Sequence, residues 1–267
     1  MTVPVVDRDE KWAPTAGLRP AMPPLPIVCL EHEYRYRWCS ESIFQRSDLM
    51  PSAPSGQCRR CGRTVQKNQA SRHLLACLGP GRELLIKAEA PRSPYFVYFT
   101  APRDTMWQAL DYTIRDLWVE CCGHLSAFTT GDNSFESEVF DPGPFPLSRR
   151  RHRAMNSPIL RGTPVNEKIV YEYDFGTTTE LVLIVVADAV NGLASDRIKL
   201  AARNAAPTYP CEQCGKPASV MVGWDRRTYC GTCQDAIPNA DREVEWPILN
   251  SPRIGICGYT GPSLEPE

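Results

Sequence analysis

The sequence lacks the features that would assign it to several large classes of protein. Its 267 residues carry a formal net charge of −1, so it has no strong basic excess of the kind found in proteins that coat nucleic acids. Its longest apolar run, Leu181 to Ala187 and a little beyond, is far shorter than the roughly 20 residues that span a bilayer. The first residues include Asp7, Asp9 and Glu10 and no apolar segment typical of a secretory signal. We therefore expect a cytoplasmic protein with no membrane role.

Catalytic signatures are also missing. The chain has no glycine-rich nucleotide-binding loop, no His-Glu-x-x-His helix and no serine, histidine and aspartate order that indicates a hydrolase. An Asp-Phe-Gly triplet occurs at 174–176, as in protein kinases, but no strand lysine or catalytic His-Arg-Asp accompanies it. We interpret this triplet as part of a turn. An enzyme is therefore the less favoured of the two function classes considered.

What the sequence does have is cysteine, with 12 residues. Two groups have the spacing of metal ligands, Cys-x2-Cys-x11-His-x3-Cys and Cys-x2-Cys-x15-Cys-x2-Cys. Two residues between cysteines let a tight turn bring both thiolates within about 2.3 Å of one ion. Disulfides or chance spacing are the alternatives, and a reducing compartment disfavours disulfides. We predict two zinc sites with these ligands: Cys58, Cys61, His73 and Cys77 in the first, and Cys211, Cys214, Cys230 and Cys233 in the second.

The two predicted sites differ in local structure. His73 and Cys77 are four residues apart, so a helix would place both on one face, as in a zinc finger. In the second site Gly215 and Gly231 each follow a cysteine, where a metal-binding turn commonly needs a positive φ, as in a zinc ribbon. Four soft ligands fill a tetrahedral shell, which indicates structural zinc. The finger is too small to bury much apolar surface, so we expect zinc to supply most of its stability.

A third group of potential ligands depends on how the chain folds. Cys121, Cys122 and His124 lie together at an expected helix-to-strand junction, and Cys257 could complete a shell if the C-terminal tail returns to it. The alternative is that these cysteines pack as small apolar residues. If only three ligands converged, an open zinc position could activate water, and the protein would be a metal-dependent hydrolytic enzyme. A further group has poor ligand spacing, and we expect no metal there: Cys29, His32 and Cys39.

Proline and glycine divide the chain into four parts. Residues 1–50 are rich in proline and predict a largely irregular leader, and residues 51–81 form the finger. Residues 82–205 form a central domain, and residues 206–267 contain the ribbon and a C-terminal tail. The pattern predicts an α+β fold, with a mostly antiparallel sheet and packed helices, flanked by the small zinc-binding modules.

Two strands and a helix are expected at the start of the central domain. Residues 83–88 and 95–100 are rich in apolar, β-branched and aromatic residues, which predicts strands. Asp104 or Thr105 could cap the helix, with Gln108 completing a capping box. Apolar residues then recur at helical spacing and predict a face packed on a core: Trp107, Leu110, Ile114, Leu117 and Trp118.

Further strands are expected beyond this helix. Residues 125–129 predict one strand, and residues 169–173 alternate in polarity as a half-buried strand does. A turn at 174–177 leads into residues 180–186, which completes a β-hairpin. The second hairpin strand is almost continuously apolar, so we expect it at the centre of the sheet, covered on both faces.

Three segments carry a resemblance to a known family: WVECCGHLSAF at 118–128, YEYDFG at 171–176 and NSPRIGICGY at 250–259. Together they resemble the bacterial plasmid ORF-three-like domain family, whose members are also labelled insertion-element TnpR-like passenger proteins. The resemblance covers roughly Leu84 to Val190 and is most specific at the Tyr-Asp-Phe-Gly hairpin. It implies an α+β domain, a bacterial source and an association with mobile elements, with no established activity. Many members follow the hairpin with an aromatic and a histidine, where this chain has Thr179 and Leu181.

Basic residues gather in two stretches that lack acids. One surrounds the finger and the other lies in an expected loop: Arg59, Arg60, Arg63, Lys67, Arg72 and Arg82 in the first, and Arg149, Arg150, Arg151, His152 and Arg153 in the second. Both could neutralise phosphates, and the alternatives are a solvated surface or a protein-binding surface. We therefore predict a zinc-stabilised binding or adaptor protein that engages nucleic acid or a protein partner through the basic finger.

Overall fold

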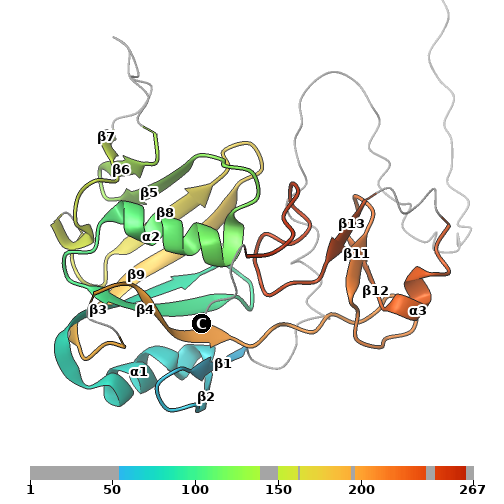
Figure 1. Ribbon diagram of the computed structural model, residues 1–267, viewed down its shortest axis with the longest axis horizontal. Coiled ribbons are helices and arrows are strands. Elements are labelled where there is room, and N and C mark those ends of the chain that lie inside the picture. Colours follow the sequence, from blue (N-terminus) through green and yellow to red (C-terminus); the bar gives the residue numbers. More distant parts are fainter. Residues whose placement is uncertain (1–53, 139–149, 162, 194–195, 239–243, 263–267) are drawn as a thin grey trace, which may run out of the picture. The chain divides into compact units, whose positions relative to one another are not determined.

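The computed structural model of the protein describes five stretches of the chain: 54–138, 150–161, 163–193, 196–238 and 244–262. All of them belong to one unit, residues 40–267, and the predicted leader at 1–50 lies outside the described residues. They form a ten-stranded sheet and a separate three-stranded sheet, with few helices (Figure 1). The α+β class with a mostly antiparallel sheet, predicted from the sequence, is confirmed.

The larger sheet has the strand order β2-β1-β10-β4-β3-β9-β8-β5-β6-β7. Its strands have these bounds: β1 Ser55–Cys58, β2 Thr64–Gln66, β3 Pro80–Glu89, β4 Phe96–Pro102, β5 Ser126–Thr130, β6 Asn133–Glu136, β7 Arg151–Ala154, β8 Lys168–Tyr173, β9 Thr179–Val190 and β10 Lys199–Asn204. Neighbouring strands are antiparallel except β6 and β7, which are parallel. Strands far apart in sequence, such as β1 and β10, therefore lie side by side.

The other elements are short. They are α1 Ala70–Leu78, α2 Trp107–Ile114, α3 Gly231–Gln234, the 3-10 turns η2 Lys67–Gln69 and η4 Ile159–Arg161, and the π-helical turn η3 Arg115–Val119 that continues α2. The smaller sheet contains β11 Val220–Val222, β12 Arg227–Tyr229 and β13 Glu245–Pro247, in the order β12-β11-β13. Among the described helices, none has the length and apolar character needed to cross a membrane.

The predicted hairpin is present as β8 and β9. These strands pair from Lys168 opposite Ile184 to Tyr173 opposite Thr179. β9 also pairs with β3, which places it inside the sheet as its apolar sequence predicts. The strand predicted at 125–129 is β5, and those predicted at 83–88 and 95–100 are β3 and β4. Alternation in β8 and runs of apolar, β-branched and aromatic residues in the other strands therefore locate them correctly.

The helix α2 packs on one face of the sheet, as predicted, but it does not begin with a capping box. Trp107 and Trp118 are fully buried in the main core with Phe128 of β5. The backbone N–H groups of the first turn donate instead to the segment 155–157, as in Gln108 N to Met155 O at 3.0 Å. The capping prediction is wrong because tertiary acceptors already satisfy these donors.

The finger is built into the larger sheet. β1 pairs with β10, and α1 lies on the face opposite α2 (Figure 1). Leu74 and Leu78 of α1 share a second core with Leu85 and Phe96 from β3 and β4. Packing against the sheet therefore contributes to the stability of the finger, and the expectation that zinc supplies most of that stability stays a prediction.

Candidate metal centres

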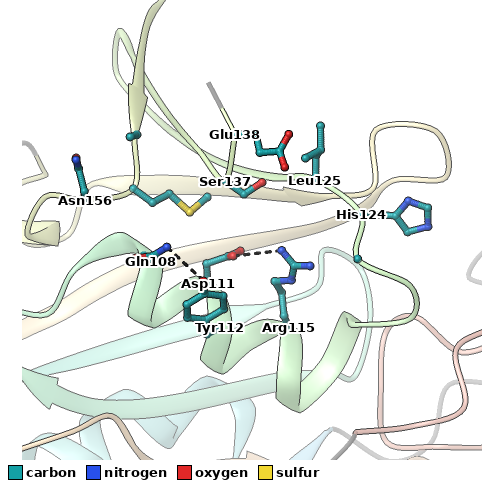
Figure 2. A pocket seen from close by; sticks show the side chains of 12 residues that line it. Gln108, Asp111, Tyr112, Arg115, His124, Leu125, Ser137, Glu138 and Asn156 are labelled. Atoms are coloured by element: carbon teal, nitrogen blue, oxygen red, sulfur yellow. Dashed lines mark hydrogen bonds and ion pairs between the residues drawn. The ribbon is translucent and has the colours of Figure 1, made fainter. Parts of the chain in front are cut away.

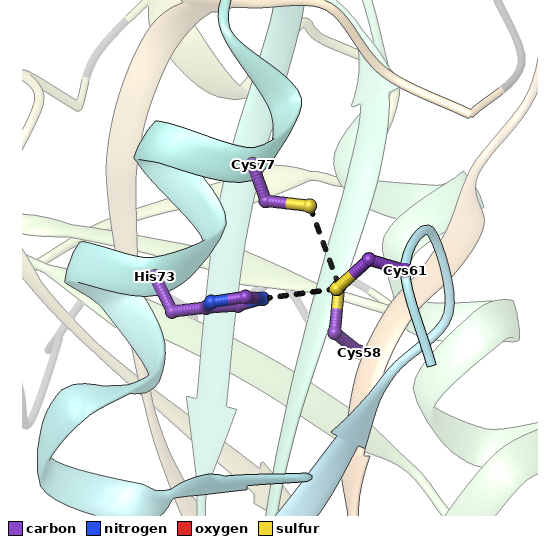
Figure 3. A group of neighbouring side chains, drawn as sticks. All are labelled: Cys58, Cys61, His73 and Cys77. Atoms are coloured by element: carbon purple, nitrogen blue, oxygen red, sulfur yellow. Dashed lines mark hydrogen bonds between the residues drawn. The ribbon is translucent and has the colours of Figure 1, made fainter. Parts of the chain in front are cut away.

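The first cluster joins a tight turn to a helix. Cys58 ends β1, and the turn after it is closed by Gly62 N to Cys58 O at 2.8 Å. His73 and Cys77 lie one turn apart on α1 and point toward the same space as Cys58 and Cys61 (Figure 3). The separations are 3.9 Å between the Sγ atoms of Cys58 and Cys77, and 3.5 Å from Cys61 Sγ to His73 Nε2. All four donor atoms lie within 4.8 Å of one another, so the cluster could hold a metal ion.

The pKa values of Cys61 and Cys77 in this cluster are shifted in opposite directions. Burial, together with the neighbouring thiols of Cys61 and Cys58, raises the pKa of Cys77 to about 11. A backbone hydrogen bond from Arg63 is the main cause that lowers the pKa of Cys61. Several thiolates so close together repel one another, and a divalent cation removes that repulsion. The arrangement therefore favours metal binding by the deprotonated thiols.

The second cluster occupies the three-stranded sheet. Gly215 has φ +70° and its N–H donates to Cys211 O at 2.8 Å, which forms the predicted metal-binding turn. Cys230 follows β12, and Cys233 lies on α3. Gly231 was expected to have a positive φ as well, and this is wrong, because it begins α3 and does not close a left-handed turn.

The thiol of Cys211 has an environment suited to a thiolate. Burial alone would raise its pKa, but backbone hydrogen bonds from Cys230, Cys214 and Gln213 lower the pKa of Cys211 to about 6. Cys214 Sγ lies 3.7 Å from Cys230 Sγ, and all four sulfur atoms of the cluster lie within 4.8 Å of one another. This cluster could also hold a metal ion.

The third cluster forms because the C-terminal tail returns to the end of η3. Cys122 Sγ lies 3.0 Å from His124 Nε2 and 3.6 Å from Cys257 Sγ. Cys121 Sγ is 3.7 Å from Cys122 Sγ, and Cys257 Sγ is 3.6 Å from His124 Nε2. These four donor atoms also lie within 4.8 Å of one another. The cluster predicted from the sequence is therefore assembled and could hold a metal ion, and the enzyme alternative at this site stays a hypothesis.

A buried ion pair lies against this cluster and contacts Cys121. Arg253, in the tail, is completely buried and donates from Nη2 to Asp174 Oδ2 at 2.6 Å and to Cys121 Sγ at 3.4 Å. Burial would raise the pKa of Asp174, but hydrogen bonds from Thr177 and Arg253 hold the pKa well below its usual range. Asp174 Oδ2 also lies 3.5 Å from His124 Nε2. Arg253 therefore places a positive charge beside Cys121.

The Asp-Phe-Gly triplet serves both the turn and this cluster. Asp174 has φ +64°, and its Oδ1 accepts the N–H groups of Gly176 and Thr177, as expected of a turn residue. Its other oxygen bonds Arg253. The role beside the cluster was missed from the sequence, because it depends on a residue in the distant tail.

Tyr173 also orients the third cluster. Its Oη accepts the backbone N–H of Cys121 at 3.4 Å and that of His124 at 3.3 Å. The same hydroxyl donates to Glu120 Oε1 at 2.9 Å, and Glu120 is paired with Arg115. The backbone of the ligand loop is therefore fixed by a network that includes the hairpin. Hydrogen bonds of this kind commonly orient metal ligands.

A pocket of about 290 Å³ lies beside the third cluster (Figure 2). Asp111 on its floor is buried, and its Oδ1 accepts Ser126 Oγ at 2.7 Å and Tyr171 Oη at 2.9 Å. Arg115 lies 3.6 Å from Asp111 and also pairs with Glu120. Asp111 and Arg115 are thus already paired within the protein, whereas the exposed carboxylate of Glu138 also lines the pocket.

The predicted basic residues are only partly available. Arg59, Arg63 and Arg72 are exposed around the finger, whereas Lys67 pairs with Glu89 at 3.2 Å. Arg60, also exposed, donates to Asn191 O at 3.1 Å.

The second basic run was expected to be a loop, and this is wrong for Arg151, His152 and Arg153, which lie in β7. His152 Nδ1 lies 2.6 Å from Glu136 Oε1, and Arg153 donates to Asn133 at 3.1 Å. These contacts make the run part of the sheet edge. Several predicted residues lie outside the described residues: Arg149, Cys29, His32 and Cys39.

No protein-family model and no curated protein matches the chain. Among solved structures, the crystal structure of a protein of unknown function, MM3350 from Methanosarcina mazei Go1, is similar over 45% of this chain and 68% of that chain. The sequence identity is 12% and the TM-score is 0.37. The resemblance to the plasmid ORF-three-like family therefore stays a prediction.

Proposed function

We propose that this is a zinc-stabilised binding protein, in which closed zinc centres hold a basic surface that engages nucleic acid. The observation that carries the proposal is that each of three clusters brings four cysteine or histidine donors within 4.8 Å of one another. Soft donor sets of this kind favour tetrahedral zinc. Four protein ligands leave no coordination position for a reacting water, so the zinc ions are structural.

A cytoplasmic location fits this proposal. The ten described cysteines are all free of disulfides, and every one belongs to a four-donor cluster. Zinc thiolates are stable where thiols are kept reduced. By its resemblance to the plasmid ORF-three-like family, we further propose that the protein acts in association with bacterial mobile elements.

The finger surface supports nucleic acid as the partner. Arg59, Arg63 and Arg72 are exposed, and their side chains have no carboxylate partner among the described residues. Exposed guanidinium groups pair readily with phosphate oxygens. Because the whole chain has little net charge, binding is expected to be confined to this surface.

Elemental analysis tests the zinc centres. We expect three zinc ions per chain in the purified protein. Cys77→Ser, Cys233→Ser and Cys257→Ser, each in a different cluster, should each lower the zinc content by one ion. Two zinc ions per chain in the wild type, with the same number in Cys257→Ser, would exclude zinc binding at the third cluster.

Fluorescence anisotropy with labelled DNA and RNA oligonucleotides tests the partner. Binding should weaken steeply as salt rises, because neutralised phosphates release counterions. A combined Arg59→Gln, Arg63→Gln and Arg72→Gln variant should lose most of the affinity. Absence of binding to both oligonucleotides at low salt would exclude the proposed role.

A further inference from the structure

The polarity of one face of the larger sheet changes where the finger joins it. Thr64 of β2 and Arg203 of β10 both lie opposite Gln57 of β1, so the three side chains project from one face of the sheet. Arg203 lies opposite Val97 of β4, which is part of the main core. The face that is apolar under α2 is therefore polar and basic across β2, β1 and β10.

The opposite face of these strands is not available. Cys58 and Val65 belong to the second core, which α1 covers. Gly56 packs so closely that a Cβ atom there would lie 2.3 Å from Arg203 O. Any partner of β2, β1 and β10 must therefore approach the polar face.

This polar face is hollowed. A pocket of about 400 Å³ is lined by Gln57, Arg59, Thr64 and Arg203, together with Asn250 from the tail. Two of the lining residues are arginines, and no carboxylate lines the pocket among the described residues. A concave site with positive charge and amide and hydroxyl donors suits an anion.

Both arginines are positioned by the fold. The backbone N–H of Arg59 donates to Ala201 O at 2.8 Å, while its side chain remains exposed. Arg203 donates to Asn250 O, and Asn250 in turn bonds Asn204. These contacts orient Arg203 from the tail side of the pocket.

We infer that this face binds the phosphate groups of a nucleic-acid strand, with Arg59 and Arg203 as the charged contacts and Gln57 and Thr64 as neutral donors. The inference rests on the proposed function and specifies which surface carries it. Thr64 and Arg203 lie two β-strands apart, with about 4.8 Å between neighbouring strands. Their side chains can therefore contact neighbouring phosphates along one nucleic-acid strand. Among the described residues that line the pocket none is aromatic and able to stack on bases, so we expect its contacts to be independent of sequence.

The test uses the full-length, zinc-loaded protein and a labelled single-stranded oligonucleotide. Arg59→Gln should weaken binding about tenfold, and should reduce the slope of log affinity against log salt by about 0.7. Gln57→Glu should weaken binding as well, because it places a negative charge among the phosphates. Arg161→Gln, an exposed arginine of η4, is the matched control and should change neither quantity.

The outcomes separate this inference from the broader proposal. Arg72 lies on α1, on the other side of the sheet. If Arg72→Gln weakens binding while Arg59→Gln and Gln57→Glu do not, the polar face is excluded and nucleic-acid binding stands. If the wild type binds no oligonucleotide, both ideas fail. Binding of inorganic pyrophosphate, blocked by Arg59→Gln but without oligonucleotide binding, would overturn the nucleic-acid assignment. Unchanged zinc content and unfolding temperature show that the variants are folded.

Discussion

Arg253 in the C-terminal tail and Asp174 in the β8–β9 turn form a buried ion pair, with 2.6 Å between Nη2 and Oδ2, although 79 residues separate them. The same guanidinium donates to Thr177 O at 3.1 Å and to Thr179 Oγ1 at 2.9 Å. Its contact with Cys121 Sγ connects the pair to the third cluster. One side chain therefore joins the tail, the hairpin and the third cluster of potential metal ligands.

Removal of this arginine should destabilise the protein strongly. Arg253→Met leaves Asp174 buried without its charge partner, so we expect the free energy of unfolding to fall by about 3–5 kcal/mol. Urea unfolding of the zinc-loaded protein measures this. The matched control is Arg227→Met, because Arg227 pairs with Asp225 at an exposed site and should cost less than about 1 kcal/mol. Equal losses in the two variants would contradict the buried pair.

Asp111 should give stability a pH dependence of the opposite sign to that of most carboxylates. Burial raises its pKa and outweighs the hydrogen bonds from Ser126 and Tyr171 and the charge of Arg115. A carboxyl group that binds its proton more tightly in the folded state loses stability as pH rises from its unfolded pKa of about 3.9 through its raised folded pKa. Asparagine does not titrate, so the wild type should lose stability relative to Asp111→Asn across this window.

The measurement is the difference in urea midpoint between the two proteins from pH 4 to pH 8 with excess zinc. Acid-induced zinc release affects both proteins, so the difference between their urea midpoints reports the titration of Asp111. A difference that moves in favour of the wild type with rising pH would contradict the raised pKa.

Local patterns explain which parts of the structure could be predicted from the sequence. Alternation over 169–173 depends only on neighbouring residues, and it locates β8 correctly. The spacing from Cys211 to Cys214 specifies a turn in the same local way. The third cluster could be predicted because three of its members, residues 121, 122 and 124, lie close together in the sequence.

Long-range contacts explain what could not be predicted. The pairing of β1 with β10 joins segments separated by most of the central domain, and nothing in either short strand specifies the other. Arg253 has no periodic or motif signal that relates it to Asp174. The first residues of α2 predict a capping box, yet the backbone N–H groups of its first turn donate to Met155 O and Ser157 O. Carbonyl groups distant in sequence thus accept the hydrogen bonds that a capping side chain would otherwise accept.

The glycines after the ribbon cysteines should differ in their tolerance of a side chain. Gly215 has φ +70° with nothing within 4 Å of a Cβ atom, so Gly215→Ala meets only backbone strain, about 1–2 kcal/mol. Zinc affinity of the second cluster should fall by roughly tenfold, measured by competition with a chelator. Gly231→Ala is the control, because Gly231 begins α3 and also has open space, and its affinity should not change. Similar losses would show that the left-handed turn is not the cause.

The attachment of the finger to the sheet should depend on Gly56. A Cβ atom there would lie 2.3 Å from Arg203 O and 2.9 Å from the ring of Phe96, and the backbone oxygen cannot move without breaking the β1–β10 pairing. Gly56→Ala should therefore lower the free energy of unfolding by about 1–3 kcal/mol.

Hydrogen exchange shows where this loss arises. Amide protection should fall selectively in β1, β2 and the facing part of β10, while β8 and β9 keep theirs. Gly258→Ala provides the comparison, because a Cβ atom there meets nothing within 4 Å. Protection in β1 that is unchanged in Gly56→Ala would mean that the finger is held by α1 and its metal ligands and does not need the strand pairing. Selective loss would establish that the polar face across β2, β1 and β10 exists only while that pairing is intact.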